Sequence, residues 1–367
     1  MKILDRYVFA EVFFTFLFGV MVFTILFISA DLLFRMAKMM VEGGASFKVA
    51  LSFLLNSLPQ ILVFTFPMSM LLACLLGFGR LSGESELVAM KASGISFPRI
   101  IVSAVVFSLL IAFLSFAVNN YIAPITTFNA QNILINYLMR SDTQIKENMV
   151  LRDRSADGSD RLLYIRRIDN REGTMQGVFI HYFVNGKRTR EIFAEEAVWE
   201  GNTWYLTQPR TIEFAPDESI KYESVSERAE LPLLGSPQEL MKRQKNKEEM
   251  NLGELRAKLK QYSQMKENVN KKDYNELAVY YQQRYALPFT CFVFSLFGIP
   301  LGVRPQRTSK SIGLGLSLVF IFIFYLFMTI GTTVGVQGSL PPLVAAWLAN
   351  LVFGGVGIYM IVEASKK

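Results

Sequence analysis

The feature that most constrains this chain is a set of long segments without any charged side chain. The longest covers the 52 residues 311–362, and four more cover residues 12–30, 49–79, 100–139 and 285–303. About 20 apolar residues span the hydrocarbon core of a bilayer as a helix. Within lipid, every backbone polar group must also be hydrogen-bonded inside the segment. These segments therefore predict an integral membrane protein built on transmembrane helices.

The final segment is too long for one helix, since a bilayer core needs only about 20 residues. It is interrupted by Gly331, Gly335 and Gly338 and by the tandem Pro341-Pro342, which weaken or remove helical hydrogen bonding. We place one span at about residues 311–333 and another at about 342–362. The sequence therefore predicts six transmembrane helices, three before the central region and three after it.

The distribution of the net charge of +7 indicates membrane topology and argues against a nucleic-acid partner. Residues 140–284 hold 25 Lys or Arg and 24 Asp or Glu, so the surplus lies in the spans and their short loops. With the N-terminus inside the cell, ten cations lie on the cytoplasmic side, against three in short outer loops, as the positive-inside rule requires. The ten are Lys2, Arg6, Arg80, Lys91, Arg99, Arg304, Arg307, Lys310, Lys366 and Lys367, and the three are Arg35, Lys38 and Lys48.

The central region has the pattern of a β domain. Asn185-Gly186 separates the strand-like residues 178–184 and 189–199, and this dipeptide is a strong β-hairpin signal. Further short runs with alternating polarity and frequent turns predict a sandwich or jelly roll. Both faces of residues 178–183 are largely apolar. The second face is therefore either covered by ordinary core packing or lines a groove.

A basic stretch follows the predicted strands. Residues 241–260 contain seven Lys or Arg against three Glu. Leu252, Leu255, Leu259 and Tyr262 recur at the spacing of one helix face. Such a helix packs on the β domain or lies on the membrane surface, and both alternatives stay open.

The sequence lacks the side-chain patterns of catalysis and metal binding. His181 is the only histidine, and its place in a predicted strand favours a structural role. No cluster of His, Cys and carboxylates has metal-ligand spacing, and Lys310-Ser311 lacks both glycines of a phosphate-binding loop. We therefore expect a protein that is not an enzyme and that carries no cofactor.

The loop between the second and third spans has the pattern of a short helix. Ser82 or Ser85 can cap its first turn, where Glu84 and Glu86 suit the positive helix end. Gly94 is placed to end it.

Within this loop, residues 80–99, Leu87 and Met90 share an apolar face beside the acidic residues. A short helix with acidic and apolar faces suits docking to a soluble partner. The alternative is a solvated loop helix without a partner.

Several short motifs occur in a fixed order along the chain. They are Leu4-Asp5-Arg6-Tyr7, Gly79-Arg80-Leu81, Ser85-Glu86-Leu87-Val88-Ala89-Met90, Ala286-Leu287-Pro288-Phe289, Leu301-Gly302-Val303-Arg304-Pro305 and Leu340-Pro341-Pro342-Leu343. Together they resemble the LptF/LptG (YjgP/YjgQ) permease family, and the resemblance covers essentially the whole chain. The Leu-Asp-Arg-Tyr and Ser-Glu-Leu-Val forms are closer to LptG than to LptF.

The resemblance implies six transmembrane α-helices with a periplasmic all-β jelly-roll or sandwich domain inserted between the third and fourth helices. Residues 1–139 would hold the first three helices with the cytoplasmic coupling loop 80–99. Residues 140–272 would form the β domain with its connecting helix, and residues 273–367 the last three helices. We expect a multi-pass protein of the bacterial inner membrane, with both termini in the cytoplasm.

The function implied is that of a non-catalytic permease subunit of the ABC transporter that exports lipopolysaccharide for outer-membrane biogenesis. In this family two permease halves pair with an LptB ATPase dimer and hand lipopolysaccharide through jelly rolls toward LptC and LptA. The second half would be a paralogue or another copy of this chain. A lipoprotein-release or FtsX-like permease is the alternative transporter, although such permeases usually have four spans. A membrane scaffold for periplasmic proteins is the alternative outside transport.

The resemblance also implies roles for individual residues. The coupling glutamate of the family corresponds to Glu86, with Glu84, Leu87 and Met90 beside it on the ATPase-coupling helix.

The family's first and fifth spans line the central cavity, and basic residues near the outer end of the first span contact substrate phosphates. This points to Arg35 and Lys38, with Phe23 and Phe27 on the apolar stripe of the same span. Asp31 departs from the family, which tends to have Lys near this position, and an acid there repels a phosphate. The alternative is that the aromatic stripe packs on neighbouring helices and the cations bind membrane head groups.

Overall fold

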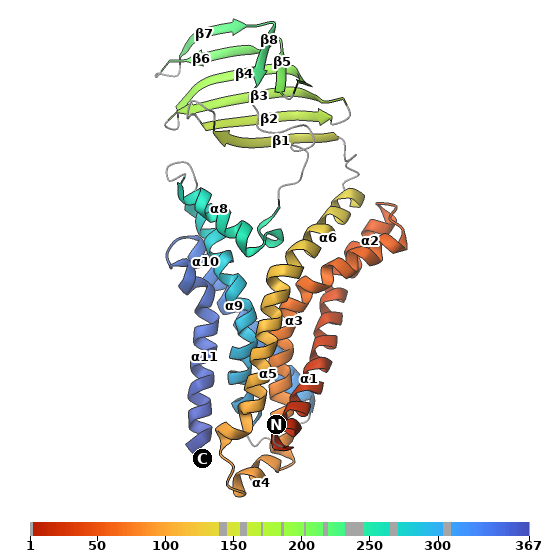
Figure 1. Cartoon of the computed structure of the whole chain (residues 1–367), viewed down its shortest axis with the longest axis vertical. Helices are drawn as coiled ribbons and strands as arrows, with labels where there is room; N and C mark the ends of the chain where they lie inside the picture. Colours follow the sequence, from red (N-terminus) through yellow and green to blue (C-terminus); the bar gives the residue numbers. More distant parts are fainter. Residues whose placement is uncertain are drawn as a thin grey trace. The chain divides into compact units, whose positions relative to one another are not determined.

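The computed structural model describes residues 3–138, 145–154, 160–169, 172–184, 187–201, 203–215, 219–231, 245–264, 271–303 and 310–366. The predicted turn at Asn185-Gly186 and the cations Lys2, Arg304, Arg307 and Lys367 lie outside the described residues. Contacts divide the chain into two units, residues 1–134 with 245–367 and residues 135–244. The first unit is a helical bundle and the second is built mainly of strands (Figure 1).

The described residues contain six apolar helices that are long enough to cross a membrane, as predicted. The first span consists of α1 (Ile3–Phe27), η1 (Ile28–Leu32) and α2 (Leu33–Val41), and the third of α5 (Phe97–Ala117), η2 (Val118–Ile122) and α6 (Ala123–Leu138). The others are α3 (Phe47–Gly83), α9 (Lys271–Gly302), α10 (Lys310–Val336) and α11 (Pro342–Lys366). The break between α10 and α11 lies at Gly338 and Pro341-Pro342, as predicted, whereas α10 runs through Gly331 and Gly335 to Val336.

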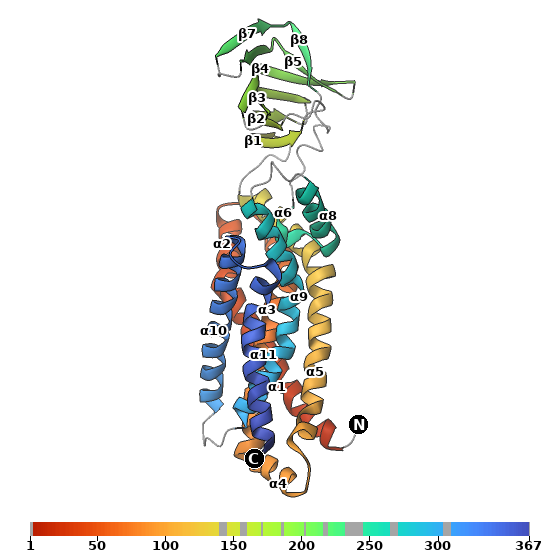
Figure 2. The same ribbon diagram turned by 90° about the vertical axis from the view of Figure 1, so that its left-hand side faces the viewer.

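The spans differ sharply in how deeply they are buried. In their most apolar 18-residue stretches, 83% of the residues of α3 and 67% of those of α9 are buried. The corresponding fractions are 22% in the first span and 17% in the fifth span, α10. Figure 2 shows α3 and α9 between α10 and α5. The second and fourth spans are therefore the centre of the unit, and the first and fifth lie at its margin.

Small residues allow α3 and α9 to approach closely. A Cβ atom at Gly302 would lie 3.0 Å from the carbonyl oxygens of both Cys74 and Leu75. At Gly298 the same atom would lie 3.0 Å from the Cβ of Cys74. Small residues at such contacts are typical of membrane helix pairs, where close backbone packing replaces the hydrophobic drive for association.

A buried arginine joins three segments of the helical unit. Arg284, in α9, is only 2% exposed. Its Nη1 donates to the backbone oxygen of Asn119 and to its side-chain oxygen at 3.0 Å. Its Nη2 donates to the carbonyls of Glu248 and Met250, each at 2.9 Å.

The Asn119 carbonyl that binds Arg284 lies in an irregular part of the third span. Asn119 lies in η2, a π-helical segment within the third span. The wider hydrogen-bonding pattern of a π segment disturbs the regular ladder, and such segments are frequent at functional sites. Asn119 Nδ2 also donates to the carbonyl of Arg284 at 3.2 Å, so the two residues bind each other reciprocally.

The amphipathic helix predicted after the strands is present and belongs to the helical unit. It is α8 (Leu252–Gln264), preceded by the short η3 (Lys247–Glu249). Leu255 is buried in a cluster with Met250 and with Leu277 of α9, and Leu259 and Tyr262 pack against this cluster. Its apolar face therefore packs on α9, which differs from both surfaces considered from sequence.

The β unit confirms the predicted all-β insert between the third and fourth spans. Its strands are β1 (Ile145–Arg154), β2 (Asp160–Asp169), β3 (Thr174–Val184), β4 (Lys187–Glu200), β5 (Thr203–Thr207), β6 (Arg210–Phe214), β7 (Ile220–Val225) and β8 (Arg228–Leu231). They form one antiparallel sheet in which β4 is central. One edge of β4 pairs with β3, and the other is shared by β6 and β5.

The two faces of the sheet have different surroundings. One face carries a buried core that includes Leu163, Val178, Ile180 and Trp204. On the other face Tyr164, Phe179 and Phe193 are directly opposite one another on β2, β3 and β4. The rings of Phe179 and Phe193 lie 4.6 Å apart, and Phe179 is partly exposed. These three residues, the aromatic ladder, account for the apolar second face seen in the sequence.

His181 lies on this second face, beside the aromatic ladder. Its Nδ1 lies 2.8 Å from Glu191 Oε1 on β4. Arg188 Nη1 donates to the same oxygen at 2.7 Å. His181 thus takes part in a polar contact between strands β3 and β4.

Replacing Arg284 by Met should destabilise the helical unit. The carbonyls of Asn119, Glu248 and Met250 would lose a charged donor, and each buried group left unpaired costs about 1–3 kcal/mol. We expect a clear fall in the apparent Tm of the detergent-solubilised protein. Arg256→Met, at an exposed position of α8, is the matched control and should leave the Tm nearly unchanged. Equal Tm values for both variants would contradict the role given to Arg284.

Candidate functional site

The helix predicted in the loop after the second span is present as α4 (Glu86–Ala92). The predicted serine cap is wrong: Ser85 precedes the helix in a left-handed conformation with φ 60° and makes no side-chain cap. The Ser82 hydroxyl lies within α3 and donates to the Val303 carbonyl at 3.0 Å. Because α3 continues to Gly83, the chain must turn at once into α4, and Ser85 makes that turn.

The end of α4 agrees with the sequence. Gly94 has a φ of 81°, and its N–H donates to the Lys91 carbonyl at 2.9 Å. The N–H of Ile95 donates to the Met90 carbonyl at 3.2 Å. This pair of bonds is a Schellman motif, in which a glycine adopts the left-handed conformation.

The apolar residues of α4 do not share one environment. Leu87 is 3% exposed and lies in a core cluster with residues of α1, α3 and α5, and Met90 is partly buried against that cluster. Val88 is 65% exposed. Leu87 therefore anchors α4 to the bundle, and the free apolar surface of the helix is centred on Val88.

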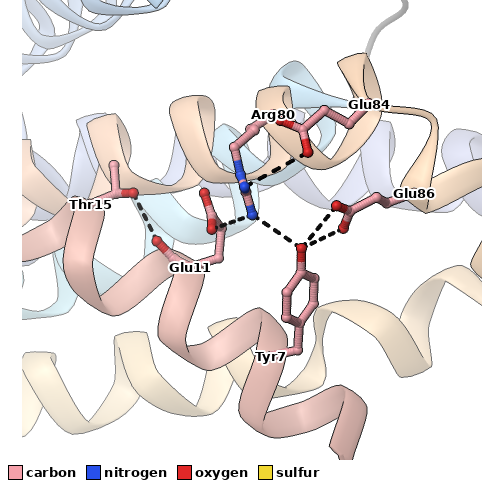
Figure 3. Close-up of polar contacts among 6 residues, drawn as sticks. All are labelled: Tyr7, Glu11, Thr15, Arg80, Glu84 and Glu86. Atoms are coloured by element: carbon pink, nitrogen blue, oxygen red, sulfur yellow. Dashed lines mark hydrogen bonds and ion pairs between the residues drawn. The ribbon is translucent and has the colours of Figure 1, made fainter.

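Glu86 belongs to a polar network between the ends of α1, α3 and α4 (Figure 3). The Tyr7 hydroxyl lies 2.7 and 2.9 Å from the two carboxylate oxygens of Glu86, to which it donates. Arg80 Nη2 donates to the Tyr7 hydroxyl at 3.1 Å and lies 2.6 Å from Glu11 Oε2. Arg80 Nη1 lies 3.7 Å from Glu84 Oε2. We call these five residues the Tyr7 network.

The Tyr7 network combines three carboxylates with one guanidinium, so it leaves negative charge at this end of the bundle. A second polar link close by joins α1 to α5, where Nη1 and Nη2 of Arg99 donate to the Asp5 carboxylate at 2.6 and 3.0 Å. Within the described ranges no group of three or more His, Cys, Asp or Glu side chains could hold a metal ion. The arrangement supplies hydrogen-bond acceptors and an exposed apolar residue, which suits docking to a basic surface of another protein.

Of this network, only Glu84 and Glu86 were predicted from the sequence to belong to a coupling site. Tyr7 occurred in a motif without a role, Arg80 counted only toward the cytoplasmic positive charge, and Glu11 was not considered. The spacing of Arg80 and Glu84, four residues apart, is a signal for an ion pair on one helix face. The partnership of Tyr7 with Glu86 joins residues 79 positions apart and has no local signal.

The residues predicted to bind substrate lie at the opposite end of the first span from Tyr7 (Figure 1). Arg35 Nε lies 2.7 Å from Asp31 Oδ2, and Lys38 Nζ lies 3.7 Å from Glu42 Oε2. Both cations therefore have acidic neighbours one turn away. These side chains are all substantially exposed, and exposed ion pairs contribute only about 0–1 kcal/mol.

The two aromatic residues of this span that were predicted to contact substrate, Phe23 and Phe27, pack inside the helical unit. Phe23 is buried in a cluster with residues of α3, α9 and α10, and Phe27 packs against that cluster. Within this single chain, Phe23 and Phe27 therefore pack on neighbouring helices, which is the alternative to substrate contact considered from the sequence. The residues predicted for coupling thus lie together at one end of the helical unit, and the cations predicted to bind substrate lie at the opposite end of the first span.

Comparisons with known proteins agree with the motifs. A family described as lipopolysaccharide export system permease LptF/LptG matches residues 6–363. The lipopolysaccharide export system permease protein LptG of Escherichia coli strain K12 is 26% identical over 214 residues. The same protein of Escherichia coli O6:H1 matches to the same extent. Each match covers 56% of this chain and 56% of the relative, so the chain spans about half the length of the curated relatives it matches.

Replacing Leu87 by Ala should loosen α4 from the bundle. Truncating a buried leucine costs about 2–5 kcal/mol through lost contacts and the cavity left behind. We expect faster hydrogen exchange of the α4 amides in the purified protein. Val88→Ala is the control and should leave exchange unchanged, because that side chain is exposed. Equal exchange in both variants would show that Leu87 does not anchor the helix.

Proposed function

The chain belongs to the LptF/LptG family of lipopolysaccharide export permeases, and from this premise we propose that it is one permease half of an ATP-driven lipopolysaccharide transporter. It extracts lipopolysaccharide from the inner membrane and passes it through its β domain toward the outer membrane. The observation that carries this proposal is the family match over residues 6–363, which takes in six apolar helices and the β insert. Membership in this family also leaves no ground for the lipoprotein-release alternative.

A half-transporter needs a surface on which the second permease half can pack. The low burial of two spans in this chain supports such a surface. The first span and α10 are the least buried of the six. These are the first and fifth spans, which the family resemblance assigns to the central cavity. We propose that they face a second permease half, either a paralogue or another copy of this chain.

We propose that both termini and α4 lie in the cytoplasm and that the β unit lies in the periplasm. The N-terminus, the C-terminus and α4 lie at one end of the helical unit (Figure 1). Lys91, Arg99 and Lys366 lie in the described residues at this end. Their positive charge supports a cytoplasmic placement under the positive-inside rule.

We propose that a separate LptB-like ATPase dimer supplies the energy and docks on α4. Glu86 and Glu84 offer acceptors there, and Val88 adds the exposed apolar contact. Leu87 contributes by holding the helix in place, and Met90 supports it from its partly buried position. Glu86 is the proposed coupling residue. Its contact with Tyr7 is compatible with this role, because a carboxylate has about four lone-pair sites and the single Tyr7 proton leaves room for a donor on the ATPase.

The edge of the β unit supports transfer to LptC- or LptA-like proteins. Among the described strands, β1 pairs with β2 alone, so its other edge has no partner strand in the described part of the chain. An open edge is a template for pairing with a strand of another protein. We propose that lipopolysaccharide leaves the β unit along such a contact.

For the substrate we propose that the phosphates of lipid A bind Arg35 and Lys38 at the outer end of the first span. Phe27 and Phe23 lie further along the same span, toward the acyl chains. A phosphate would have to displace Asp31 from Arg35 and Glu42 from Lys38. Because both pairs are exposed, that exchange costs little, while a charge-assisted bond to a phosphate is a strong one.

Asp31→Asn should therefore strengthen substrate contact at this site. With a photo-crosslinking residue at Phe27, we expect more lipopolysaccharide adduct in the Asp31→Asn background than in the wild type. Gln60→Ala, on α3, serves as a background control without a change of charge. An unchanged or weaker adduct would mean that the phosphates do not bind Arg35.

The proposed function predicts the result of depletion and rescue. Depleting the protein should strand lipopolysaccharide in the inner membrane, and the purified wild-type complex should contain an ATPase. Glu86→Ala should insert normally and fail to restore export, whereas Glu227→Ala, at an exposed position between β7 and β8, should restore it. A chain that binds no ATPase and whose depletion leaves lipopolysaccharide in place would instead act as a scaffold.

A further inference from the structure

We propose that Tyr7 is the positioning residue through which Glu86 acts on the first span. This inference rests on the proposed function and adds to it a route from the coupling helix to the helix that faces the cavity. The observation behind it is the direct side-chain bridge between α1 and α4 in the Tyr7 network (Figure 3).

The bridge involves both oxygens of the Glu86 carboxylate. The Tyr7 hydroxyl has one proton, and at 2.7 and 2.9 Å it is shared between the two oxygens. Hydrogen bonds to an ionised acceptor are roughly twice as strong as neutral ones. Glu86 is therefore held in orientation by α1.

Arg80 reinforces the bridge from α3. It donates to the Tyr7 hydroxyl, which frees the tyrosine proton to point at Glu86, and it pairs with Glu11. Tyr7 and Glu11 are four residues apart and so lie on one face of α1. The network thus contacts two successive turns of α1.

The bridge leaves Glu86 able to bind a partner at the same time. One proton from Tyr7 occupies part of a carboxylate that can accept about four hydrogen bonds. A donor on the ATPase can add to the Tyr7 contact without displacing it. A movement of α4 with its partner is then transmitted to α1 through the tyrosine.

The difference in burial between α1 and α3 indicates which of these helices moves when α4 moves. The most apolar stretch of α3 is 83% buried, whereas that of the first span is 22% buried. A segment with few buried contacts moves at a lower cost in free energy than one packed on every side. A pull on Glu86 should therefore shift α1 and leave α3 in place.

Tyr7→Phe removes the hydroxyl and keeps the ring, and it should be measured in the complex purified with its ATPase and reconstituted in vesicles with lipopolysaccharide. We expect lipopolysaccharide released per ATP hydrolysed to fall by about tenfold, the factor that one charge-assisted hydrogen bond carries. The Tm and the recovery of the ATPase should be unchanged. Tyr359→Phe is the matched control, since Tyr359 is 69% exposed on α11. A Tyr7→Phe complex that releases as much per ATP as the control overturns the proposal.

A second comparison separates positioning from a general structural role. If Tyr7 acts through Glu86, the variant that combines Tyr7→Phe with Glu86→Gln should release no less per ATP than Glu86→Gln alone. Losses that multiply would show that Tyr7 acts independently of Glu86 and would overturn the proposal.

A third measurement does not depend on the substance transported. Tyr7→Phe should speed hydrogen exchange of the α4 amides in the same complex, relative to Tyr359→Phe. If the wild-type complex releases no lipopolysaccharide, the proposed function fails, and faster exchange still supports the bridge. Unchanged exchange shows that Tyr7 does not hold Glu86 and α4, whatever the complex transports.

Discussion

The structure depends on one constraint, which is that polar groups inside a bilayer must find partners within the protein. Polar side chains at the contacts of the central helix α9 are used in this way. Ser295 donates to Ser108 of α5 at 2.8 Å, and Asn350 of α11 donates to the Ala286 carbonyl at 2.8 Å. Because these polar groups must find hydrogen-bond partners inside the protein, their bonds also fix the helices against one another. They explain why α9 lies at the centre, with neighbours on several sides.

Arg284 is the most demanding case of the same constraint. Its described acceptors are carbonyl and amide oxygens, and each is supplied by a segment that departs from regular helix. Asn119 lies in a π segment, and Glu248 and Met250 lie in and directly after a short 3-10 turn. Carbonyls in irregular segments have fewer backbone N–H partners than those inside a continuous α-helix, so they are well suited to accept the guanidinium N–H groups. The irregular segments therefore supply the acceptors that satisfy this buried cation.

The sequence alone was sufficient for the spans, for the strand region and for the position of α4. These features follow from apolar length, alternation and a terminal glycine, all of which are local signals. It was insufficient for Tyr7 with Glu86 and for Arg284 with Asn119, whose partners lie 79 and 165 positions away. It also placed the cap of α4 wrongly, since the length of α3 decides the backbone at Ser85. These contacts and the Ser85 conformation depend on how the helices pack in three dimensions, which no local sequence pattern encodes.

The pairing of Arg35 with Asp31 has a consequence for a transporter of the proposed kind. A cation without any partner would hold a phosphate tightly, and tight binding at an intermediate site slows release. An exposed carboxylate one turn away competes with the phosphate at a cost of about 0–1 kcal/mol. It can also take the guanidinium back when the substrate moves on. On this view Asp31 does not argue against a substrate role for Arg35; it supplies the weak competitor that lets the same site bind lipopolysaccharide and release it in turn.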